Sequence, residues 1–293
     1  MSPEVEFLRP TSLAEALEMK AANPAAVPIA GGTDVMVEVN FDHRRPAALL
    51  DLTRVGELTA WSEADGQVTF GAGLPYTRLI DELGDALPGL AIASRTVGSP
   101  QIRNRGTVGG NLGAASPAGD THPVLLACKA VVEVASTGGS RMIPADEFYL
   151  GVKRNALRPD ELIVAIHLPR ATGPQQFSKV GTRNAMVIAV CSFGLALHPA
   201  QRRVGAAIGS AAPTPRRAAE AEEFLAGELD WENRQWPADS VKRRFGELVA
   251  AAASPIDDVR GGAAYRKLAL SVMARRTLDW AWQEYSEGER SCA

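Results

Sequence analysis

Short apolar runs and one amphipathic stretch alternate over the first 55 residues. Ser12 and Glu15 have the spacing of a capping box, in which a serine and a glutamate at a helix start bond to backbone amides. The amphipathic stretch that follows ends near Asn23 and Pro24, and the apolar run 47–52 comes after it. We therefore predict that residues 1–55 form a small βαβ unit.

Strand-like and helical patterns are mixed over residues 56–170. Apolar runs typical of strands occupy residues 67–73, 130–136 and 161–169. Helical spacing occupies residues 77–83 and 122–128. Paired glycines at 138 and 139 predict a hairpin after the second strand. This region is expected to be an α+β unit.

Residues 171–293 change in character from strands to helices. Strand-like apolar runs occupy 177–181, 185–197 and 203–212. An alanine-rich part with helical spacing follows and ends at residues 263–285, so we predict an antiparallel sheet with helices. In the last helix a set of apolar residues recurs at helical intervals, and we expect it to face the core rather than a partner protein: Tyr265, Leu268, Val272, Met273 and Trp280.

Composition restricts the class of protein. The chain has 293 residues, of which 46% are hydrophobic and 22% charged, as in ordinary globular proteins. Its formal net charge of -3 argues against nucleic acid as a partner. No apolar run has membrane-spanning length, and the first residues lack the pattern of a secretory signal. We expect a cytoplasmic protein with no membrane partner.

Cysteine and histidine are few and scattered. The cysteines form no CxxC pair, so neither a disulfide framework nor an iron–sulfur or zinc site is expected in this chain: Cys128, Cys191 and Cys292. The histidines also lack metal-ligand spacing and are predicted to be surface or strand-end residues: His43, His122, His167 and His198. No metal ligand is therefore assigned.

Two glycine-rich segments carry the candidate chemistry. The first, 28–39, reads as a strand, a tight turn at Gly31–Gly32 and a helix start, where free amides and the helix dipole favour a pyrophosphate. The second, 102–126, contains three glycines that can bring main-chain N–H groups close to a ligand. Ordinary turns are the alternative for both. Neither segment fits the GxGxxG or GxxxxGK[ST] pattern.

Six segments together resemble a known family. They occur in the order LRPTSLAEAL (8–17), AGGTD (30–34), LLDLTRVGEL (49–58), IRNRGTVGGN with SPAGD (102–120), FSKVGTRNAMVIAVCSFGLAL (177–197) and DDVRGGAAYRKLALSVMARR (257–276). The chain thereby resembles, over nearly its whole length, the FAD-binding medium subunit of the molybdenum hydroxylases, the xanthine dehydrogenase family. The resemblance implies an α+β fold: a two-part FAD-binding domain of the vanillyl-alcohol oxidase and enolpyruvylglucosamine reductase type, plus a C-terminal sheet-and-helices domain.

The resemblance also implies a set of residues that contact FAD. Those around the phosphates and neighbouring hydroxyls would be Ile29, Ala30, Gly31, Gly32, Thr33, Asp34 and Val35, together with Thr107, Val108, Gly109, Gly110, Asn111 and Ser116. Val97 and Ile163 would lie near the flavin ring. Asp120 would accept from ribose or ribityl hydroxyls, and could also cap the helix that follows it. Lys179 would approach the flavin, with an exposed strand-end lysine as the alternative.

The function implied by the resemblance is electron transfer. FAD would be bound non-covalently, because neither glycine turn contains a histidine or cysteine. A small partner subunit would carry [2Fe–2S] clusters and a large one molybdopterin, in a dimer of heterotrimers, and the flavin would pass electrons to an acceptor such as NAD or oxygen. The segment 257–262 resembles one that lies near the other subunits. The alternatives are a self-contained flavin reductase or oxidase of the same fold, and a scaffold that has lost FAD.

Overall fold

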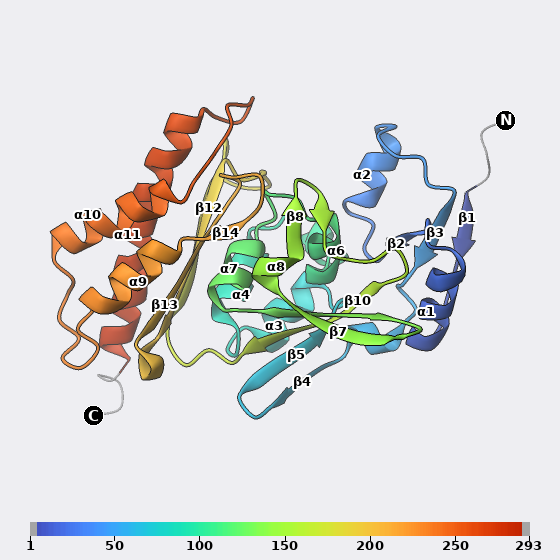
Figure 1. Cartoon of the computed structure of the whole chain (residues 1–293), viewed down its shortest axis with the longest axis horizontal. Coiled ribbons are helices and arrows are strands. Elements are labelled where there is room, and N and C mark those ends of the chain that lie inside the picture. Colours follow the sequence, from blue (N-terminus) through green and yellow to red (C-terminus); the bar gives the residue numbers. More distant parts are fainter. Residues whose placement is uncertain (1–4, 289–293) are drawn as a thin grey trace.

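Three main sheets follow one another along the long axis of the molecule (Figure 1). The structure is a computed structural model and describes residues 5–288. The small N-terminal sheet lies at one end, and the C-terminal sheet with its long helices lies at the other. Cys292 is outside the described residues.

The N-terminal unit is the predicted βαβ arrangement. Its elements are β1 (Glu6–Leu8), α1 (Leu13–Ala22), β2 (Val27–Ile29), α2 (Val35–Asn40) and β3 (Ala48–Asp51). The strands pair in parallel in the order β1-β3-β2. Ser12 caps α1 by accepting from the amide of Glu15, which confirms the start predicted for this helix.

The central unit is built on a five-stranded antiparallel sheet in the order β4-β5-β10-β6-β7. Its strands are β4 (Trp61–Ala64), β5 (Gln67–Gly71), β6 (Val131–Ser136), β7 (Gly139–Pro144) and β10 (Leu162–Pro169), with a separate hairpin of β8 (Tyr149–Gly151) and β9 (Arg154–Asn155). The predicted glycine turn between β6 and β7 is confirmed, because Gly139 has a φ of 126°. Side chains of one face form a buried core that includes Val68, Phe70 and Ile166.

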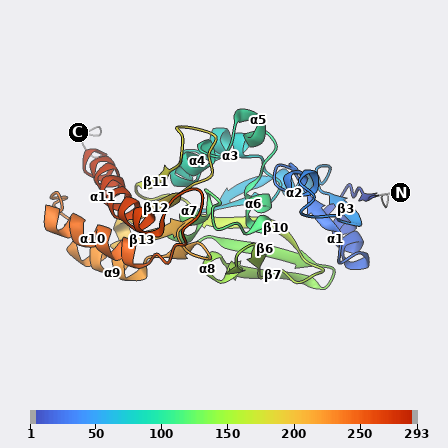
Figure 2. The same cartoon turned by 90° about the horizontal axis from the view of Figure 1, so that it is seen from above.

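Helices cover that core face. The helices with side chains in this core are α3 (Tyr76–Leu83), α4 (Pro88–Arg95), α6 (Val108–Ala114), α7 (His122–Ala127) and α8 (Ala145–Phe148). The same unit also contains η1 (Gly56–Thr59) and α5 (Pro100–Arg103). Figure 2 shows α3, α4 and α5 on the side away from β6 and β7. The helices predicted over 77–83 and 122–128 are confirmed as α3 and α7.

The C-terminal unit is an antiparallel sheet in the order β11-β12-β13-β14. Its elements are β11 (Gln175–Val180), β12 (Cys191–His198), η2 (Pro199–Gln201), β13 (Arg203–Gly209), β14 (Arg216–Arg217), α9 (Ala219–Glu228), α10 (Asp239–Ala251) and α11 (Ala263–Glu287). Helix α7 packs on β12 and β13, and α11 packs on β11 and β12. The C-terminal sheet therefore joins the central unit to the last helices.

The strand predicted over 185–197 begins later than expected. Residues 181–190 form a loop, and pairing starts only at Cys191. Met186 has a φ of 49°, which a strand does not allow. Met186, Val187 and Ile188 line a cavity instead of pairing with a neighbouring strand of the sheet.

The prediction that the apolar stripe of α11 faces the core is largely wrong. Tyr265, Leu268 and Trp280 are about half exposed or more, and only Met273 of the stripe is buried. The buried face instead includes Ala269, Leu270, Ala274, Thr277, Leu278, Ala281 and Trp282. Small alanines on this face allow α11 to approach the sheet, whereas apolar spacing alone does not distinguish the two sides of the helix.

The prediction that the histidines are surface or strand-end residues is wrong for His122, which is buried at the start of α7. It holds for His198, which is the last residue of β12. His122 and His198 are buried, and only His43 is exposed. His167 lies on β10, where its Nε2 is 2.9 Å from Glu133 and its Nδ1 is 2.9 Å from the hydroxyl of Thr69. Among residues 5–288, no helix is both long and apolar enough to cross a membrane.

Candidate functional site

A cavity of about 690 Å³ opens where the N-terminal unit meets the central one. Its walls come from the turn after β2, the start of α6, the loop 116–120 and the loop 186–188. All the residues predicted for the site line it except Ile29, Val108 and Lys179. The two glycine segments, about 70 residues apart in the sequence, therefore face one space.

The three exceptions lie just behind the wall. The side chain of Ile29 packs under the turn, where a Cβ added to Gly32 would be 3.4 Å from it. Val108 is 1% exposed and belongs to the core. Lys179 reaches the cavity only through Asp120.

The turn after β2 presents free backbone donors. Gly32 has a φ of 72°, which favours glycine. Within residues 5–288, the amides of Gly32, Thr33 and Asp34 donate to no other group. Helix α2 begins after Asp34 as expected, although the Asp34 side chain makes no capping bond. Adjacent unpaired amides of this kind bind phosphate oxygens.

The structural role of Gly31 differs from the phosphate contact that we expected. A Cβ at this position would lie 1.8 Å from the carbonyl oxygen of Arg105. The glycine therefore lets the two glycine segments touch each other, rather than letting a ligand approach. This contact closes the wall between them.

The second glycine segment is the start of α6. Thr107 is the N-cap, and its Oγ1 accepts from the amide of Gly110 at 2.9 Å, which leaves its hydroxyl hydrogen able to donate. A Cβ on Gly109 would clash with the carbonyl of Ala72, whereas one on Gly110 would meet only Thr107 at 3.1 Å. Gly110 is therefore the glycine that leaves space in the cavity. The amide of Gly106 bonds within the preceding turn.

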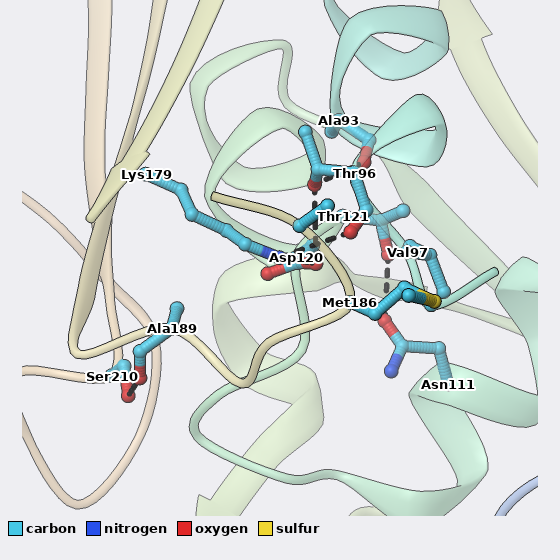
Figure 3. A network of polar contacts seen from close by, with 12 residues as sticks. Ala93, Thr96, Val97, Asn111, Asp120, Thr121, Lys179, Met186, Ala189 and Ser210 are labelled. Carbon is cyan, nitrogen blue, oxygen red and sulfur yellow. Dashed lines mark hydrogen bonds and ion pairs between the residues drawn. The ribbon is translucent and has the colours of Figure 1, made fainter. Parts of the chain in front are cut away.

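A buried ion pair marks one end of the cavity (Figure 3). Nζ of Lys179 lies 2.6 Å from Oδ2 of Asp120 and 3.0 Å from the carbonyl of Thr96, and both charged side chains are 9% exposed. The hydroxyl of Thr96 donates to the same carboxylate oxygen at 3.1 Å. Burial raises the pKa of Asp120, and the charge of Lys179 acts in the opposite direction.

Two of the alternatives for these residues are wrong. Thr121, not Asp120, is the N-cap of α7, because the Asp120 side chain turns to Lys179 and Thr96. Lys179 is buried, whereas the alternative placed it at an exposed strand end. Oδ1 of Asp120 is buried without a partner among the described residues, so it is available to a ligand hydroxyl.

Thr121 fixes the orientation of a cavity-lining amide. Its hydroxyl donates to Oδ1 of Asn111 at 2.8 Å (Figure 3). The side-chain amide nitrogen of Asn111 can therefore donate to a ligand. Asn111 was expected in the site, but nothing in the sequence indicated that Thr121 holds it.

His122 and Tyr149 form a second layer that sequence reasoning missed. The Tyr149 hydroxyl is 2.8 Å from Nδ1 of His122, and both rings are buried. Burial lowers the pKa of His122 to about 3, so the ring is neutral near pH 7. Its Nε2 edge packs on Gly119, where an added Cβ would lie 2.2 Å away.

The far end of the cavity is mostly apolar. Residues that line it include Val27, Pro28, Leu52, Leu58, Leu157 and Leu162. An ion pair of 2.6 Å between Lys153 and Glu38 ties the β8–β9 hairpin to α2 along the rim. Lys153 and Glu38 are 115 positions apart, so no local pattern could have grouped them.

The residues present fit FAD. An apolar pocket suits an adenine ring, unpaired amides suit a pyrophosphate, and a carboxylate with a free oxygen suits a polyhydroxy chain. Among the described residues, no group of three or more histidine, cysteine, aspartate or glutamate side chains could hold a metal ion. The fold and the site define a FAD-binding domain in two parts.

Comparison with known proteins gives the family. Residues 3–171 match the family described as "FAD binding domain in molybdopterin dehydrogenase". Residues 176–281 match the family described as "CO dehydrogenase flavoprotein C-terminal domain". The chain belongs to this family of flavoprotein subunits, those of xanthine dehydrogenase-like oxidoreductases, as the sequence segments predicted.

Relatives and a solved structure cover between 74% and 97% of the chain. The nicotine 6-hydroxylase medium subunit of Paenarthrobacter nicotinovorans is 29% identical over 282 residues, covering 94% of this chain and 96% of its own. The xanthine dehydrogenase FAD-binding subunit of Escherichia coli O157:H7 is 33% identical over 232 residues, covering 74% and 77%. A carbon monoxide dehydrogenase structure from Hydrogenophaga pseudoflava has 27% identity and a TM-score of 0.88, covering 97% of this chain and 99% of that chain.

Proposed function

We propose that this chain holds one non-covalent FAD in the cavity and serves as the electron outlet of a molybdenum hydroxylase. The observation that carries the proposal is the meeting of the two glycine segments at one cavity with free amides and an unpartnered carboxylate oxygen. The residues predicted from the sequence would supply the contacts, with Ile29, Val108 and Lys179 acting from behind the wall.

The phosphate contacts would come from two backbones. The amides of Gly32, Thr33 and Asp34 would donate to one side of the pyrophosphate, and the hydroxyl of Thr107 to the other. Oδ1 of Asp120 would accept from a hydroxyl of the ribityl or ribose chain. Lys179 would keep that carboxylate ionised and hold it in place.

Non-covalent binding is favoured by what surrounds the cavity. Among the described residues, no cysteine or histidine lines it. His122 lies behind Gly119 with its Nδ1 facing Tyr149, and Cys128 is 1% exposed. A covalent link would need one of these groups to reach the flavin.

The partners follow from the same proposal. FAD, when bound, would collect electrons from [2Fe–2S] clusters of a small subunit and pass them to NAD or oxygen. A large subunit would hold molybdopterin and oxidise the substrate, in a dimer of heterotrimers in the cytoplasm. We also propose the unit boundaries 1–55, 56–170 and 171–293.

Rapid kinetics of the assembled complex test this division of labour. In a Thr107→Ala complex, substrate should still bleach the clusters at the normal rate, while reduction of the acceptor falls about tenfold because FAD occupancy drops. Thr107→Ser keeps the hydroxyl and should behave as wild type. If cluster bleaching and acceptor reduction fell equally, the chain would take part in substrate oxidation and the proposal would be wrong.

A further inference from the structure

Ser210 lies directly after β13, and its side chain bonds to the backbone of Ala189 (Figure 3). It is 7% exposed and has a φ of 57°. Its amide donates to the carbonyl of Pro117 at 2.7 Å, and its Oγ donates to the carbonyl of Ala189 at 2.6 Å. Its own carbonyl accepts from Nη1 of Arg266 at 2.6 Å. Each polar group of Ser210 therefore serves a different segment.

Two of these segments belong to the cavity. Pro117 lies in the loop 116–120, and Ala189 directly follows residues 186–188; both stretches line the cavity. We call the loop 116–120 and the segment 186–189 together the flavin wall. One buried residue thus bonds both parts of the flavin wall.

The segment 181–189 has little else to hold it. Arg183 bonds to the carbonyls of Ala185 and Met186, but these contacts lie inside the segment. Within residues 5–288, the bond from Ser210 to Ala189 is the hydrogen bond that ties the segment to the rest of the protein. Loss of this bond should therefore release the segment without disturbing the sheet below it.

Arg266 extends the connection to the surface. It is 3% exposed, and its Nη2 lies 2.5 Å from Oδ1 of Asp258. Asp258 also accepts from the amide of Arg260 at 2.8 Å, which shapes the turn 257–262. Val259 at the tip of this turn is fully exposed. A buried guanidinium requires its carboxylate partner, so the turn and Ser210 are held together.

We propose that Ser210 and Arg266 are positioning residues that hold the flavin wall closed, and that they couple the surface turn 257–262 to it. The inference rests on the proposed function for the identity of the ligand. The position of the wall is a property of the chain itself, so it can be measured without FAD.

Limited trypsin digestion of the FAD-free chain tests the positioning. Arg183 is exposed in the segment, and cleavage after it can be followed by mass spectrometry. Ser210→Ala removes one hydrogen bond and should raise the cleavage rate roughly two- to tenfold, because proteolysis follows the population of the open form. The matched control is Ser192→Ala, since the buried Ser192 hydroxyl has no partner among the described residues. Its cleavage rate should be that of wild type.

Asp258→Asn tests the coupling from the surface side. It should also accelerate cleavage after Arg183, whereas Asp239→Asn, which removes an exposed carboxylate bonded to Lys242, should not. In Ser210→Ala and Asp258→Asn, the rate of FAD dissociation should rise by a factor similar to the rise in cleavage rate. If Ser210→Ala does not fold by circular dichroism, Ser210→Gly, which suits the positive φ, replaces it.

Equal cleavage in Ser210→Ala and Ser192→Ala would overturn the positioning role. Wild-type cleavage in Asp258→Asn would overturn the coupling. Failure of the proposed function would look different, because wild type would then not bind FAD while the cleavage differences between variants remained.

Discussion

Gly109 and Gly110 are neighbours with opposite surroundings. A side chain on Gly109 would strike the backbone of Ala72, whereas one on Gly110 would extend into the cavity. A substitution at Gly109 therefore tests folding, and one at Gly110 tests binding.

We predict that Gly110→Val folds but does not retain FAD. The added side chain would occupy the space next to Thr107 where phosphate is expected, and its Cβ would lie 3.1 Å from Oγ1 of Thr107. Flavin absorbance after purification measures retention. The control is Gly227→Val, which places the same side chain in open space on α9 and should leave FAD bound. Normal flavin content in a folded Gly110→Val would place the site elsewhere.

The buried His122 predicts a dependence of stability on pH. Burial lowers the pKa of His122 to about 3, whereas the unfolded chain takes up a proton near pH 6.5. The contribution of His122 to stability is therefore complete above pH 6.5 and is lost as the pH falls toward 3. Between pH 7 and pH 5 this loss amounts to about 2 kcal/mol.

Urea unfolding of His122→Gln at the two pH values checks this effect. The variant should be less stable at pH 7, because the contact with Tyr149 is altered, but should lose about 2 kcal/mol less than wild type between pH 7 and pH 5. His43→Gln, at an exposed position, should keep the wild-type dependence. An identical pH dependence in His122→Gln and wild type would mean that folding does not lower the pKa of His122.

Helix α11 shows how an apolar pattern can mislead. Both of its sides carry large apolar residues, so helical spacing could not tell the side that meets the sheet from the one that meets solvent. The buried side is distinguished by alanines, which allow close approach to β11 and β12.

Two leucines on opposite sides of α11 test the corrected assignment. Leu278 is fully buried, so Leu278→Ala should cost about 2–5 kcal/mol of unfolding free energy. Leu268 is 65% exposed, so Leu268→Ala should change it by less than about 0.5 kcal/mol. Denaturant unfolding measures both. A large loss of unfolding free energy in Leu268→Ala would support the original prediction that Leu268 faces the core.

Local signals in the sequence were sufficient for most elements. The capping pair Ser12 and Glu15 and the turn at Gly139 each depend on nearby residues, and both are present. The loop 181–190 was not foreseen, because its apolar residues serve a cavity formed by distant segments. Apolar composition does not say which surface a side chain meets.

At the scale of the whole molecule, the two glycine segments, which we expected to form one site, line one cavity. The residues that hold them in place were not predicted, because Thr121, His122, Tyr149 and Ser210 act through contacts between elements. The bond from Lys179 to Asp120 likewise joins the C-terminal sheet to the central unit. Such long-range contacts leave no periodic trace in a sequence.

The central claim is that the cavity holds one FAD without a covalent bond. Titration of the FAD-free wild-type chain, followed by flavin fluorescence, tests it most directly. The account predicts saturation at about one FAD per chain, and acid precipitation should then release all the yellow colour into the supernatant. A folded chain that binds no FAD, or a pellet that stays yellow, would contradict it.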